Sequence, residues 1–142
     1  MTTKEYLGQI IRLDMKINNR LLEIEQARKL ACSISAISYE ERVQTTPNFD
    51  KIGTALCKIE QMQERLNNLI DEYVDKKMAL IEQIENIENE IHRTILYKKY
   101  VNGELFTKME EEFNYSYRNL MRHYKKALIV FEEKYGHLYL DE

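Results

Sequence analysis

The feature that most limits the fold is a run of apolar residues, spaced alternately four and three apart, between Ile52 and Ile91. This spacing puts the apolar side chains on one side of an α-helix and is the heptad pattern of coiled coils. Polar residues interrupt the run at Gln63 and Lys77. A helix of ~40 residues is ~60 Å long, so its apolar side needs a partner helix. The run comprises Ile52, Leu56, Ile59, Leu66, Ile70, Tyr73, Leu80, Ile84, Ile87 and Ile91.

Residues 3–31 predict the partner helix, which starts near a capping residue at Thr2 or Thr3. Residues 32–49, rich in Ser and Thr, contain the single proline, Pro47, and predict a loop because the residue before a proline avoids helical geometry. The two helices would then pack antiparallel. The apolar stripe of the first helix comprises Tyr6, Ile10, Leu13, Ile17, Leu21 and Ile24, widened by Leu7, Ile11, Leu22 and Leu30.

The C-terminal third predicts three shorter helices. The first spans residues 87–101 and ends at Gly103, a residue suited to a helix C-terminus. A capping box of Thr107 and Glu110 opens the second, which runs to about Phe113. A turn at Asn114 and Tyr115 follows, and Ser116 caps the third helix. The buried stripe of that helix is expected to be Leu120, Tyr124, Ala127, Leu128 and Phe131.

The third helix is basic although the chain has a net charge of -3. Residues 113–128 carry four basic side chains and no acidic one. Such a helix can neutralise phosphates with Lys and read base edges with Arg and Asn; the simpler alternative is a solvated helix face. Arg118 and Arg122 are candidates for base or phosphate contacts, and Tyr117 and Met121 for thymine or sugar contacts or for packing. The candidate DNA-binding residues are Tyr117, Arg118, Asn119, Met121, Arg122, Lys125 and Lys126.

The same region resembles known proteins. The resemblance rests on Tyr100 to Gly103, Phe106, Met109, the run Phe113 to Leu120, and the pair Ala127-Leu128. This pattern resembles the region 4 helix-turn-helix of bacterial sigma factors, with Glu110 and Asn114 in place of the usual alanine and glycine. The strings KEYL, ERVQT and NYSYR resemble small phage proteins of Gram-positive hosts, similar to late transcription regulators of the ArpU/RinA type.

The resemblance implies a phage or prophage DNA-binding transcription regulator in the bacterial cytoplasm, with residues 116–131 as the recognition helix in the major groove. Double-stranded DNA is the implied partner, and RNA polymerase is a second candidate. The expected fold is all-α: a long antiparallel coiled-coil hairpin in residues 1–86, then a three-helix helix-turn-helix module in residues 87–142. We expect a homo-oligomer through the coiled coil. The alternative is a non-catalytic structural or adaptor protein whose C-terminal module contacts protein.

Nothing in the sequence predicts an enzyme, a cofactor or a metal site. Cys32 and Cys57 match no zinc or CxxC spacing. His92, His123 and His137 show no metal-binding spacing, and no glycine-rich phosphate loop is present. No apolar run approaches the ~20 residues that cross a bilayer, so we expect no membrane partner.

Overall fold

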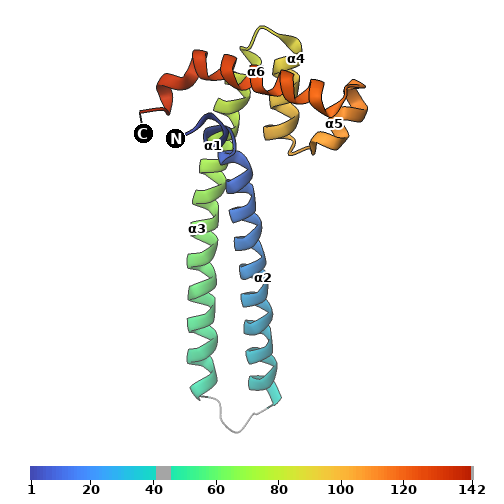
Figure 1. The fold of residues 1–142 in the computed structure, drawn as a ribbon. Helices are drawn as coiled ribbons and strands as arrows, with labels where there is room; N and C mark the ends of the chain where they lie inside the picture. The colour runs from blue at the N-terminus through green and yellow to red at the C-terminus, as the bar shows by residue number, and fades with distance from the viewer. Residues whose placement is uncertain (41–45, 142) are drawn as a thin grey trace. The chain divides into compact units, whose positions relative to one another are not determined.

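The computed structural model describes the backbone of residues 1–40 and 46–141, and the side chains of residues 1–33 and 51–141. Within these ranges the chain is all-α, without a strand (Figure 1). The helices are α1 (Thr3–Leu7), α2 (Gln9–Glu40), α3 (Thr46–Glu85), α4 (Glu90–Leu96), α5 (Phe106–Phe113) and α6 (Tyr117–Tyr135). A π-helical turn, Tyr97–Val101, follows α4, and a 3-10 turn, Gly136–Leu138, follows α6.

The N-terminal helix begins where the sequence predicts but is divided at Gly8. The Thr2 hydroxyl accepts a hydrogen bond from the Glu5 backbone N–H (3.3 Å), and the Glu5 carboxylate accepts one from the Thr2 backbone N–H (2.7 Å). This capping box fixes the start of α1. At Gly8 a Cβ would lie 3.0 Å from the Lys4 carbonyl oxygen, a close approach that glycine permits.

The prediction of a loop at residues 32–49 is wrong. Helix α2 continues to Glu40 and α3 begins at Thr46, so most of that segment is helical. Serine lowers helix stability only mildly, by roughly half a kcal/mol per residue. Pro47 lies in the first turn of α3, where a missing N–H costs no helical hydrogen bond. The ERVQT string, Glu41 to Thr45, lies outside the described residues.

The chain divides into two compact units that do not follow the expected boundary between residues 86 and 87. One unit combines Met1–Leu13 with Tyr73–Glu142, and the other is Asp14–Glu72. The N-terminal residues join the C-terminal unit because Leu7 and Ile10 belong to its core.

In the Asp14–Glu72 unit, α2 and α3 lie side by side and run antiparallel (Figure 1). Each helix contributes one buried row with seven-residue spacing: Ile17, Ile24 and Ala31 on α2, and Ile59 and Leu66 on α3. Other residues expected in the stripe are not buried: Leu21, Leu56 and Ile70 are 49%, 52% and 36% exposed. In this pair α2 covers the row of Ile59 and Leu66 and leaves the side chains of Leu56 and Ile70 at the edge.

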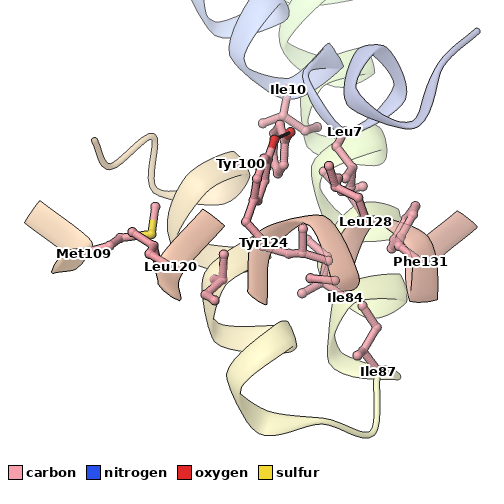
Figure 2. Close-up of a cluster of buried hydrophobic side chains, with 14 of the residues drawn as sticks. Leu7, Ile10, Ile84, Ile87, Tyr100, Met109, Leu120, Tyr124, Leu128 and Phe131 are labelled. Atoms are coloured by element: carbon pink, nitrogen blue, oxygen red, sulfur yellow. Dashed lines mark hydrogen bonds between the residues drawn. The ribbon is translucent and has the colours of Figure 1, made fainter. Parts of the chain in front are cut away.

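The core of the other unit is built around α6 (Figure 2). All five residues expected in the buried stripe of α6 are buried, and Leu120, Ala127 and Phe131 are fully so. The prediction of this stripe is confirmed. Residues from every helix of the unit pack with it: Leu7, Ile10, Leu80, Ile84, Ile87, Ile95, Leu96, Tyr100, Met109 and Tyr139.

Polar contacts join the two chain ends within this unit. The Tyr139 hydroxyl donates to Thr3 Oγ1 (2.9 Å), and the Thr3 hydroxyl donates to Glu132 Oε2 (2.9 Å). The Tyr6 and Tyr139 rings stack with centroids 4.4 Å apart. Thr3 is buried, and its hydroxyl both donates and accepts a hydrogen bond, as buried polar groups usually do.

Phe131→Ala is expected to lower the free energy of unfolding by about 3–5 kcal/mol, because it removes a fully buried ring that packs near Tyr6, Tyr135 and Tyr139. Urea denaturation followed by circular dichroism measures the change. The matched control is Ile129→Ala on the same helix, where the side chain is 56% exposed and the cost should stay within about 0.5 kcal/mol. Equal losses in the two variants would contradict this account of the core.

Candidate nucleic-acid interface

The start of α6 is fixed by a tight turn after α5. Asn114 adopts the left-handed conformation, with φ 56° and ψ 41°, and its N–H donates to the Glu110 carbonyl oxygen. The Ser116 hydroxyl accepts from the Asn119 backbone N–H (3.2 Å) and caps α6. The predicted turn at Asn114 and the predicted cap at Ser116 are therefore confirmed.

The predicted capping box of Thr107 and Glu110 is wrong. Helix α5 begins at Phe106, and Leu105 occupies the capping position without a side-chain hydrogen bond. Thr107 therefore lies inside the first turn, two residues after the capping position. The C-terminus of α5 at Phe113 agrees with the prediction.

The exposed side of α6 carries the seven predicted residues. Tyr117 is 60% exposed, the four basic side chains are exposed, and Asn119 and Met121 are half-buried. Six of the seven, together with Ser116, border one shallow hollow along the helix. Lys126 lies outside the hollow, on the side near His92 of α4. The set thus forms one continuous surface with Lys126 at its edge. The bordering residues are Ser116, Tyr117, Arg118, Asn119, Met121, Arg122 and Lys125.

The positive charge of this surface is not neutralised within the described part of the chain. No described carboxylate forms an ion pair with Arg118, Arg122, Lys125 or Lys126. The one polar contact is between neighbours, since Arg122 Nη2 donates to Asn119 Oδ1 (2.9 Å). That contact holds the Arg122 guanidinium in place without reducing its charge.

One of the three glutamates of α5, Glu112, forms ion pairs with lysine side chains. Glu112 accepts a hydrogen bond from Lys98 and lies 3.9 Å from Lys108 Nζ. Lys98 Nζ also lies 3.7 Å from Glu104 Oε2. The hydrogen bond with Lys98 lowers the pKa of Glu112, and the same bond raises the pKa of Lys98. Glu112 therefore contributes less negative charge beside α6 than the sequence suggests.

Two buried tyrosines fix α6 against the turn that follows α4. The hydroxyl oxygens of Tyr100 and Tyr124 lie 2.5 Å apart, and the Phe106 ring meets Tyr124 edge-on at 5.0 Å. Burial raises the pKa of both tyrosines, so both stay neutral. This turn ends at Val101, and Gly103 follows with a φ of 68°, which confirms the predicted helix C-terminus.

The structure also brings together residues that sequence reasoning missed. The rings of Phe113, Tyr115 and His123 stack in succession at 5.7 and 5.4 Å, and His92 of α4 lies 6.4 Å from His123. His92 is buried and its Nδ1 has no hydrogen-bond partner. Burial, followed by the charges of His123 and Lys126, lowers the pKa of His92. No sequence spacing links His92 to His123, because the contact depends on how α4 packs on α6.

Among the residues with described side chains, no three His, Cys, Asp or Glu residues gather in a way that could hold a metal ion. Cys32 and Cys57 are exposed free thiols. None of the described helices combines the length and the apolar character needed to cross a membrane.

No protein-family model, curated protein or solved structure matches the chain. The resemblance to sigma factor region 4 and to phage regulators therefore stays a prediction from the sequence.

The turn before α6 yields a stability prediction. Asn114→Ala should cost about 1–2 kcal/mol, because alanine lacks the side chain that makes the left-handed conformation tolerable. Asn114→Gly should cost nothing or stabilise slightly. Urea denaturation of both variants measures this, and similar losses for Ala and Gly would show that the left-handed turn is not what the residue supplies.

The burial of His92 yields a prediction on pH. Its pKa lies below the ordinary 6.5 in the folded chain, so the unfolded chain binds the proton more readily. The free energy of unfolding should therefore fall as the pH drops through about 6.5 toward the lower folded pKa. Melting temperatures measured from about pH 7.5 to about pH 5 should fall more steeply for the wild type than for His92→Phe. An unchanged slope in His92→Phe would exclude this role.

Proposed function

We propose that the chain is a transcription regulator that binds double-stranded DNA, with α5, the turn at Asn114 and α6 acting as a helix-turn-helix and α6 as its recognition helix. One observation carries the proposal. Helix α6 is buried along one side, while its other side presents four cations without an acidic partner in the described chain. A rigid helix with an unpaired basic side supplies both the positioning and the charge that phosphate binding needs.

The side chains divide by their place on the helix. Tyr117, Arg118 and Met121 lie in the first turns of α6, the part that reaches base edges in helix-turn-helix proteins. The hydrogen bond that Arg122 donates to Asn119 Oδ1 orients the guanidinium and leaves its other N–H groups for a phosphate or a guanine. Lys125 and Lys126, one turn later, suit phosphate contacts.

The contacts behind α5 support the same function. DNA phosphates would be repelled by unpaired carboxylates next to the recognition helix. Glu112 is engaged by Lys98 and Lys108, which reduces that repulsion. The sequence resemblance adds the context of a phage or prophage regulator.

A second candidate is a protein contact through the same surface, for example with RNA polymerase in an adaptor role. It is favoured by the ring of Tyr117, which is 60% exposed and lies beside the half-buried Met121. Exposed aromatic and methionine side chains are enriched where proteins bind one another.

The two candidates differ in their dependence on charge. Fluorescence anisotropy with a random-sequence duplex should show binding that weakens about 100-fold between about 50 and 200 mM salt, as about four phosphate contacts imply. Arg118→Ala/Arg122→Ala should abolish most of this binding and lower the slope of log affinity against log salt by about two.

The matched control is Lys16→Ala/Lys29→Ala, which removes the same charge from exposed positions on α2. It should bind as the wild type does. Absence of wild-type binding at low salt, or equal losses in the two double variants, would refute DNA recognition by α6 and favour the protein contact.

A further inference from the structure

The strongest feature outside the basic surface of α6 lies in the Asp14–Glu72 unit, along one edge of the α2–α3 pair. Here an apolar groove runs between the two helices, and cations of α3 border it. We propose that this groove, the α2–α3 groove, binds an acidic amphipathic helix of a partner protein. The proposal is independent of DNA binding by α6.

The groove is lined mainly by small side chains. Ala27 and Ala31 of α2 and Ala55 of α3 border a hollow of about 460 Å³. Leu30 also lines this hollow, and its side chain is 64% exposed. Small side chains let a further helix approach closely, because the distance between packed helix axes depends on the side chains at the contact. A third helix laid here would fill the hollow and cover Leu30.

A row of unpaired cations follows the same edge of α3. Lys51 and Lys58 line the hollow, and Arg65 lines a smaller hollow that shares Met62 with the first. All three cations are exposed, and none forms an ion pair with a carboxylate of the described chain. Glu23 is the one carboxylate among the described lining residues, and it already pairs with an arginine of the same helix (2.9 Å). The groove therefore offers its positive charge to an acidic partner.

The spacing of the cations matches a helix. Lys51, Lys58 and Arg65 follow one another at seven-residue intervals, which is about 10.5 Å per step along an α-helix. A second helix laid alongside repeats its own side chains at the same interval, so one row of Glu or Asp side chains would meet all three cations. Ion pairs of this kind flank the apolar seam of coiled coils.

The apolar lining distinguishes this partner from nucleic acid. A phosphate backbone would meet the cations but would also lie against Ala27, Leu30 and Ala55, whose side chains offer it no hydrogen bond. The apolar row of an amphipathic helix would instead remove these side chains from water, which is favourable. A helix with an apolar row beside an acidic row therefore suits both parts of the groove.

A defined peptide tests the proposal on the intact chain. The probe is a labelled synthetic helix of about three heptads, with leucine at positions a and d and glutamate at e and g, whose charges oppose pairing of the peptide with itself. Fluorescence anisotropy should show binding by the wild type. Lys58→Glu/Arg65→Glu should weaken this binding at least about tenfold, because like charges then meet. The same variant should instead bind a peptide with lysine in place of each glutamate.

Three controls separate the groove from positive charge in general. Arg28→Glu/Lys29→Glu reverses two cations of α2 that border neither hollow, and it should bind as the wild type does. Arg118→Ala/Arg122→Ala should also keep the binding, because the peptide does not need the basic surface of α6. Ala55→Arg should lose the binding although it adds a cation, because the longer side chain fills the groove.

Several outcomes would overturn the proposal. These are no binding by the wild type, equal losses in the two charge-reversal variants, loss of binding in Arg118→Ala/Arg122→Ala, or full binding in Ala55→Arg. Equal binding of a peptide with the same glutamates but serine at a and d would show a surface for anions in general. Circular dichroism of each variant checks its helix content. The gain of lysine-peptide binding by Lys58→Glu/Arg65→Glu cannot come from a loss of folding.

Discussion

The burial of one side of α6 is the constraint on which the C-terminal unit depends. Leu120, Ala127 and Phe131 are fully enclosed, and the Tyr100–Tyr124 hydroxyl pair locks the helix against its neighbour. Because that side is committed to the core, the four cations of α6 must face away from it. The hydrophobic effect thus sets the orientation of the basic surface.

The same core explains why the two chain ends belong together. Helix α1 is only five residues long and would not be stable alone. It is held by Leu7 in the core, by the Tyr6–Tyr139 stack and by the hydrogen bonds through Thr3. In the last turn of α6, Lys134 Nζ donates a hydrogen bond to the carbonyl oxygen of Asn86 (2.6 Å), just after α3 ends. Glu132 and Lys134 both lie in the last turns of α6, so these contacts hold its C-terminal end.

Two polar residues that depart from the expected sequence patterns form specific contacts in the structure. Gln63 interrupts the heptad run. Its side-chain amide forms hydrogen bonds with Arg28 and Asn67, which keep a polar layer beside the buried row of Ile59 and Leu66. On α5, Glu112 forms ion pairs with Lys98 and Lys108, which offset its charge. In both places a polar or charged side chain that departs from the expected sequence pattern has a specific partner in the structure.

The sequence by itself determined the all-α class, the turn at Asn114, the cap at Ser116 and the buried stripe of α6. These features are local, because periodicity and capping depend on residues within a few turns. The heptad run to Ile91 did not fix the end of α3, which stops at Glu85. The tertiary structure decided the rest: the extension of α2 to Glu40, the exposure of Leu21, Leu56 and Ile70, and the meeting of His92 with His123. Heptad spacing shows which residues share a side of a helix, but only the packing of helices decides which of two neighbouring rows is covered and which distant side chains meet.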